Sequence, residues 1–221
     1  MKNHRVKFGV VAVALSIAMA SSTAFAGRLS TSIAPVASGP GLGLVSVPAI
    51  FTPNQNNDNQ IGGGETDNNV VIPLKRFDFN NYIDIVFTIT STDGTTEYKV
   101  TEFVDNNTGV NWSNYTMQLG EGTGAGFTQF ASGSLDFDAP GYDAPPTTTG
   151  GLTAVVPTPY QLNFSGGVQT TGAQQYAFRL DIPDGRNSFT LRQFPTAVPE
   201  PTSIAMVGLA LAGLLGVGRK R

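Results

Sequence analysis

The 221-residue chain contains no cysteine, and its only histidine is His4. The missing cysteine excludes a disulfide and a thiolate metal site. A lone histidine at the extreme N-terminus leaves the rest of the chain without Ser-His-Asp or Cys-His catalysis. The chemistry that remains is that of carboxylates, either paired acids as in glycoside hydrolysis or oxygen ligands for a metal ion.

Positive charge is scarce between residues 27 and 198, where seven basic residues stand against 15 acidic ones. An acidic surface repels phosphate backbones, so we expect no nucleic-acid partner. This part of the chain, about 170 residues, is long enough for one domain with a sizeable core.

The N-terminus has the order of a signal peptide. Basic residues come first, and an apolar stretch then runs from Phe8 to Ala20. Ala24 and Ala26 place small residues where signal peptidase reads them, so residues 1–26 are predicted to be removed. A retained membrane anchor is the alternative, but a spanning helix needs about 20 apolar residues and this stretch is shorter.

The C-terminus combines three features: the tripeptide Pro199-Glu200-Pro201, an apolar run over 202–218, and the basic cluster Arg219-Lys220-Arg221. The apolar run is long enough for a helix that crosses a thin bilayer, and the basic cluster should remain on the cytoplasmic side. The two prolines favour an extended backbone that a processing enzyme can grip. The alternative, a core helix of the domain, lacks the polar face that such a helix shows.

These three features resemble the PEP-CTERM sorting signal of Gram-negative bacteria, here at residues 197–221. The resemblance implies recognition of Pro199, Glu200 and Pro201 by an exosortase, in bacteria that also make exopolysaccharide. It further implies export, transient anchoring in the inner membrane, and release to the cell surface or extracellular matrix.

The region before the signal resembles the "choice-of-anchor" group of bacterial surface domains. The resemblance lies in residues 103–112, 119–124 and 135–140. It implies a domain displayed at the surface and transfers no catalytic residue.

The pattern of the ectodomain predicts an all-β fold, an antiparallel sandwich or jelly roll over residues 70–196. Apolar residues alternate with polar ones over 82–90, which indicates a strand with one buried face. Thr92-Asp93-Gly94 predicts a turn, and with a second strand over 95–104 this makes a predicted hairpin. Further strands are expected over 110–119, 127–131, 134–137, 152–156, 160–164, 175–182 and 188–194.

Residues 27–69 are rich in Gly, Pro and Asn, which favours loop or linker structure. Two apolar islands, 42–47 and 70–72, could each be an edge strand that ends at the following proline, Pro48 or Pro73.

Three aspartates, Asp136, Asp138 and Asp143, lie in a loop-like stretch and could converge on calcium, although solvated turn acids are the commoner fate. No other cofactor is predicted. The alternate glycines from Gly120 to Gly126 fit a flexible loop or bulged strand better than a phosphate cradle.

A glycosidase would need two carboxylates across a cleft, for example Glu97 or Glu102 with Glu121. Four aromatic residues could stack on sugars or fill the core instead: Trp112, Tyr115, Tyr142 and Tyr160. We expect a non-enzymatic surface or matrix protein with signal peptidase, exosortase and exopolysaccharide as partners. The alternative is a carbohydrate-binding or carbohydrate-active module that uses Asp and Glu.

Overall fold

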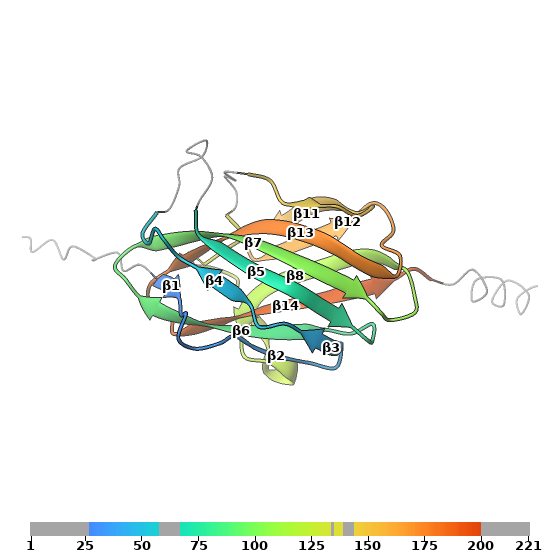
Figure 1. Ribbon diagram of the computed structural model, residues 1–221, viewed down its shortest axis with the longest axis horizontal. Coiled ribbons are helices and arrows are strands. Elements are labelled where there is room, and N and C mark those ends of the chain that lie inside the picture. Colours follow the sequence, from blue (N-terminus) through green and yellow to red (C-terminus); the bar gives the residue numbers. More distant parts are fainter. Residues whose placement is uncertain (1–26, 58–66, 134, 139–143, 200–221) are drawn as a thin grey trace, which may run out of the picture.

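The computed structural model describes residues 27–57, 67–133, 135–138 and 144–199, which form two β-sheets packed face to face (Figure 1). Eight strands make the first sheet. In spatial order they are β1 (Gly27–Leu29), β6 (Ile83–Ser91), β14 (Ser188–Ala197), β8 (Trp112–Glu121), β12 (Gln161–Ser165) and β11 (Thr153–Thr158), with β2 (Val36–Ser38) paired to β6 and β9 (Thr128–Gln129) paired to β8.

Six strands make the second sheet. They are β10 (Thr147–Thr148), β13 (Gly172–Pro183), β7 (Thr95–Asn106), β5 (Asn69–Phe77) and β3 (Leu42–Val45), with β4 (Ala49–Phe51) paired to β5. Strands β5 and β7 run parallel, and every other strand pairing within the described ranges is antiparallel. The predicted all-β, mostly antiparallel sandwich is confirmed.

The core lies between the sheets and is filled by alternate side chains of each strand. On β6 the predicted series Ile83, Ile85, Phe87 and Ile89 is buried. Because each inward residue is followed by an outward one, period-two patterning alone was enough to identify this face. Aromatic rings fill the end of the core near β8, where the Trp112 and Tyr115 rings stack with centroids 6.0 Å apart.

The predicted hairpin of residues 82–104 is wrong. Both strands form, but β6 joins the first sheet and β7 joins the second, so the turn at Thr92-Asp93-Gly94 connects the two layers. Each strand has one hydrogen-bond partner far along the chain: β6 pairs with β14, and β7 pairs with β13. A strand with one apolar face needs hydrogen-bonded neighbours at its edges and a core against that face. The strand that follows it in the chain need not provide either of them.

Pro73 does not end its strand, contrary to the prediction. Strand β5 continues through it to Phe77. The pairing with β7 shifts register between Ile72 and Lys75, and the other edge changes partner from β4 to β3 across the same point. Pro73 lies at this irregularity, where no ladder hydrogen bond is required of its nitrogen.

Segment 27–69 contributes more strand than the loop interpretation allowed, because β1 to β4 pair in both sheets. The expected edge strand at 42–47 is confirmed as β3. The expected strand at 127–131 shortens to β9, and within 135–137 only an isolated bridge forms, between Asp136 and Asp181.

The predicted signal peptide, residues 1–26, and residues 200–221 lie outside the described residues, and with them Ala24, Ala26, Glu200, Pro201 and the basic cluster 219–221. In the part of the chain that the structure describes, we find no helix with the length and apolar character to span a bilayer.

Candidate functional site

Pro199, the first residue of the predicted sorting tripeptide, is separated from the last strand of the sandwich by one residue, Val198. Strand β14 ends at Ala197 and is held between β6 and β8. Val198 then donates its N–H to the carbonyl of Asn111 at 2.8 Å, and Pro199 is exposed directly after it. The tripeptide therefore begins just after a strand that pairs with β6 over residues 188–193 and with β8 up to Ala197.

A polar groove of about 360 Å³ opens near the same strand, on the outer face of the first sheet. Its lining combines amide, aromatic and cationic side chains: Asn80, Asn81, Tyr82, Gln118, Arg192, Phe194 and Pro195. The Gln118 amide donates to the Gln161 side chain of the neighbouring strand at 2.9 Å. Amides both donate and accept, so the groove suits a neutral polar ligand.

Arg192 is the rigid part of this groove. Its guanidinium donates to both carboxylate oxygens of Asp84, at 2.7 and 2.8 Å. It also lies over the rings of Tyr82 and Phe127, about 4 Å from each centroid. A planar cation fixed by two oxygens and two rings cannot reorient readily.

The glycine-rich stretch forms a loop that closes over this ion pair. It contains the short 3-10 helix η1 (Gly124–Gly126). The Gly124 N–H donates to Asp84 at 2.8 Å, and the Gly124 carbonyl accepts from Arg192 at 2.7 Å. Gly122 has φ +73°, a conformation that glycine adopts without strain. The predicted loop is confirmed. The Gly124 N–H in this loop is already hydrogen-bonded to the Asp84 carboxylate.

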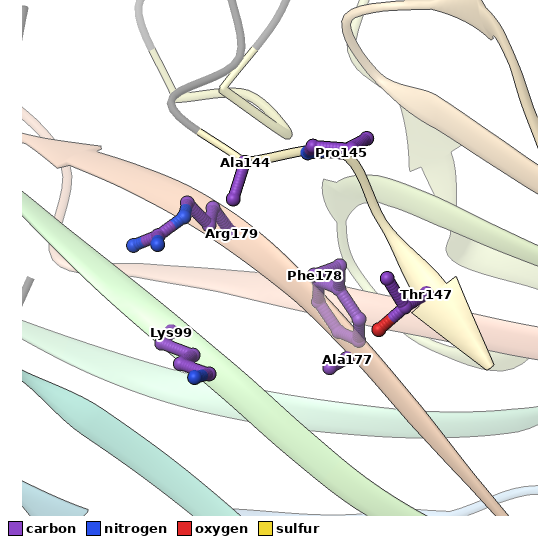
Figure 2. Close-up of a pocket in the computed structure, with 7 residues that line it drawn as sticks. All are labelled: Lys99, Ala144, Pro145, Thr147, Ala177, Phe178 and Arg179. Atoms are coloured by element: carbon purple, nitrogen blue, oxygen red, sulfur yellow. The ribbon is translucent and has the colours of Figure 1, made fainter. Parts of the chain in front are cut away.

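A smaller hollow of about 120 Å³ lies on the outer face of the second sheet (Figure 2). It is bounded by Lys99 of β7, by Arg179 of β13 and by the chain at Ala144 and Pro145. Arg179 pairs with the buried Glu97 at 2.6 Å. This cation is therefore held on the sheet rather than presented to a ligand.

The three carboxylates considered for glycoside hydrolysis do not meet. Glu97 and Glu102 both lie in β7, but an odd separation along a strand places them on opposite faces of the second sheet. Each is buried and ion-paired, with Arg179 and Lys75 respectively. Glu121 lies in the first sheet with a side chain that is 70% exposed.

The calcium prediction stays a prediction. Asp136 and Asp138 are described, whereas Asp143 lies outside the described residues. Among the described residues no group of three or more acidic, histidine or cysteine side chains is placed to hold a metal ion.

Of the aromatic residues considered for sugar stacking, Trp112 and Tyr115 are fully buried and fill the core. Tyr160 is half-buried and donates its hydroxyl to the carbonyl of Gly133 at 2.7 Å. Tyr142 lies outside the described residues.

The sequence patterns did not identify Lys75, Arg192 or Gln193 as candidate site residues. The signal that could have found Gln193 and Glu102 is a single polar residue in an otherwise apolar alternating series, as in Phe189, Leu191, Gln193.

Residues 197–221 match the family described as PEP-CTERM protein-sorting motif. The chain thus carries this motif, which indicates an exported protein that is processed by an exosortase and is transiently anchored in the membrane before display at the surface. No curated protein and no solved structure matches the chain. The resemblance to choice-of-anchor domains stays a prediction.

Proposed function

We propose that this protein is a non-catalytic component of the cell surface or extracellular matrix that associates with exopolysaccharide. The observation that carries the proposal is the sorting motif, which follows directly on a strand of the sandwich. Exosortase processing would leave the domain intact, because β14 ends before Pro199.

The polar groove beside β14 supports the carbohydrate part of the proposal. Asn81 and Gln118 offer neutral donors and acceptors, and Phe194 offers an apolar surface. Sugars present both hydroxyls and apolar C–H faces, and such a lining matches both.

The sorting step is tested by replacing Pro199, Glu200 and Pro201 with alanine in the producing bacterium. We expect the C-terminal span to remain attached, as read by mass spectrometry of the C-terminal peptides. Replacement of the nearby exposed Thr196 by alanine is the control and should leave processing unchanged. Unchanged processing in the triple variant would contradict the sorting role.

The binding step is tested with the full chain and exopolysaccharide purified from the producing bacterium. Replacing Asn81 and Gln118 with alanine should weaken binding, whereas Lys99→Ala in the hollow of Figure 2 should not. The same samples are assayed for released reducing sugar. Release above that of a heat-denatured sample would overturn the non-catalytic assignment.

A further inference from the structure

Three polar side chains meet in the apolar core between the two sheets. Lys75 comes from β5, Glu102 from β7 and Gln193 from β14, and all three are fully buried. The Lys75 Nζ donates to the Glu102 carboxylate and to the carboxamide oxygen of Gln193. The Gln193 Nε2 in turn donates to both oxygens of Glu102, at 3.0 Å each. An amine, a carboxamide and a carboxyl group are thus in mutual contact.

The register of the strands brings these three side chains into contact. Strict alternation from Val70 and Ile72 would turn Lys75 outward, but the irregularity at Pro73 shifts the inward positions to Lys75 and Phe77. The side chain of Lys75 therefore enters the core next to Glu102 of the adjacent parallel strand. Gln193 reaches them from the opposite sheet.

Two buried tyrosines adjoin the cluster. The Tyr115 hydroxyl donates to Glu102 at 3.2 Å, and its ring lies 5.5 Å from the Lys75 Nζ. Tyr176 stands opposite Glu102 in the strand register. Burial lowers the pKa of Lys75 to about 8, although Glu102 opposes this shift. A neutral, nucleophilic amine is consequently much more accessible here than for a lysine in water.

We propose that Lys75 and Gln193 become joined by an intramolecular amide bond, with Glu102 carrying the protons. The ammonium of Lys75 first gives a proton to the Glu102 carboxylate, and the neutral Nζ attacks Cδ of Gln193. The Nζ–Cδ bond forms and the Cδ–Nε2 bond breaks. Nε2 takes the proton from Glu102, Nζ returns one to it, and ammonia leaves. Atoms and charge balance with no oxidant, reductant or cofactor.

Contact, burial and proton transfer each favour the step. The reacting groups are already held together, so the reaction is effectively unimolecular. A carboxyl group that contacts both nitrogens can serve as base for one and acid for the other. The three side chains are fully buried, which keeps bulk water away from the reacting groups and disfavours hydrolysis as a competing reaction.

The bond would connect the two sheets through residues 118 positions apart in the chain. A cross-link over so long a loop restricts the unfolded chain strongly. It would also join β14, the strand that leads directly into the sorting motif, to the opposite sheet. A cysteine-free exported domain would thereby gain a covalent tie of the kind that disulfides usually supply.

The test is peptide mass spectrometry of the full chain, expressed without exosortase and digested with trypsin. The linked product joins the peptide 29–76 to the peptide that begins at Gln193, with a mass one ammonia below their sum. Separate peptides with unmodified Lys75 would overturn the proposal. A product one water below the sum, joining 29–76 to the peptide that begins at Val100, would also overturn it, because Glu102 would then be the acyl donor.

Variants assign the role of each group. Gln193→Leu should abolish the link, and Glu102→Gln should slow its formation by roughly a hundredfold or more. Glu97→Gln, on the same strand but the opposite face, is the matched control and should link fully. Efficient linking in Glu102→Gln would overturn the role of Glu102. The wild-type result does not depend on sorting or on exopolysaccharide, so it stands or falls separately from the proposed function.

Discussion

Arg192 and Gln193 are neighbours in β14, yet they belong to two polar clusters of different character. Arg192 points to the outer face of the first sheet, where it pairs with Asp84 beneath the glycine loop and is 14% exposed. Gln193 points into the core, where it contacts Lys75 and Glu102 with no exposure at all. One strand thus supplies an ion pair on the outer face of its sheet and a core cluster from adjacent positions.

The difference lies in the cation that each cluster uses. The guanidinium of Arg192 stays charged in proteins and fits a carboxylate through two parallel hydrogen bonds, so its cluster is a fixed structural element. The amine of Lys75 can lose its proton when buried, so its cluster can react. The identity of the cation, together with the deeper burial of the core cluster, decides which of the two clusters has chemistry.

The largest expected effect is the loss of the carboxylate in the core. In Gln193→Leu, where no amide forms, the added change Glu102→Ala leaves Lys75 buried without a counter-charge and should lower the free energy of unfolding by about 3 to 5 kcal/mol relative to Gln193→Leu alone. Urea unfolding followed through Trp112, the only tryptophan, measures it. Asp105→Ala, a half-buried position of the same strand, is the control, with an expected change within about 0.5 kcal/mol. Equal losses in both variants would contradict the comparison.

The outer pair should matter less because the Arg192 side chain is partly exposed, although Asp84 is fully buried. Asp84→Asn removes the charge-assisted bonds to Arg192, and we expect a loss of about 1 to 3 kcal/mol in the same unfolding experiment. Arg192→Lys should not preserve stability, since an ammonium cannot make the two-oxygen contact or stack equally on Tyr82 and Phe127. Wild-type stability in Arg192→Lys would show that the geometry of the guanidinium is unimportant.

The glycine loop above the outer pair gives a smaller effect. Gly122→Ala places a side chain at φ +73° and puts its Cβ 2.3 Å from the carbonyl oxygen of Gly126, so we expect a loss of about 1 to 2 kcal/mol. Gly126→Ala is the matched control, because its Cβ would point into open space. Indistinguishable unfolding midpoints for the two variants would show that the loop yields without cost.

The smallest effect is the pH dependence of the core lysine, measured in Gln193→Leu so that no amide forms. Burial lowers the pKa of Lys75 from 10.5 to about 8, so above pH 8 the unfolded chain binds more protons than the folded one. Stability should therefore rise with pH, by about 1 kcal/mol between pH 8 and 9. The double variant Lys75→Met, Gln193→Leu should lack this rise. A fall over that range would contradict the assigned shift.

The local sequence pattern was sufficient to predict where the strands lie. It was not sufficient to predict which strands pair with each other. The alternation of Ile83, Ile85 and Phe87 marked one buried face, and that face is buried. The same alternation could not tell a hairpin from a connection between two layers, because both leave one face apolar. The turn at Asp93 is short in either case, and the choice depends on β13 and β14, which come about a hundred residues later.

The surface groove and the core cluster were beyond sequence reasoning for the same reason. Lys75 looks outward in a strict alternation and turns inward only because the register slips at Pro73. Arg192 and Asp84 are separated by 108 positions and meet through the pairing of β14 with β6.

By itself the sequence determined that the protein has an all-β ectodomain without cysteine chemistry and that residues 197–221 form a sorting motif. These properties depend on composition and on patterns a few residues long. Tertiary structure alone decided that Lys75, Glu102 and Gln193 meet in the core. Their contact depends on the strand register within each of the two sheets and on the irregularity at Pro73. Long-range strand pairing determines all of these.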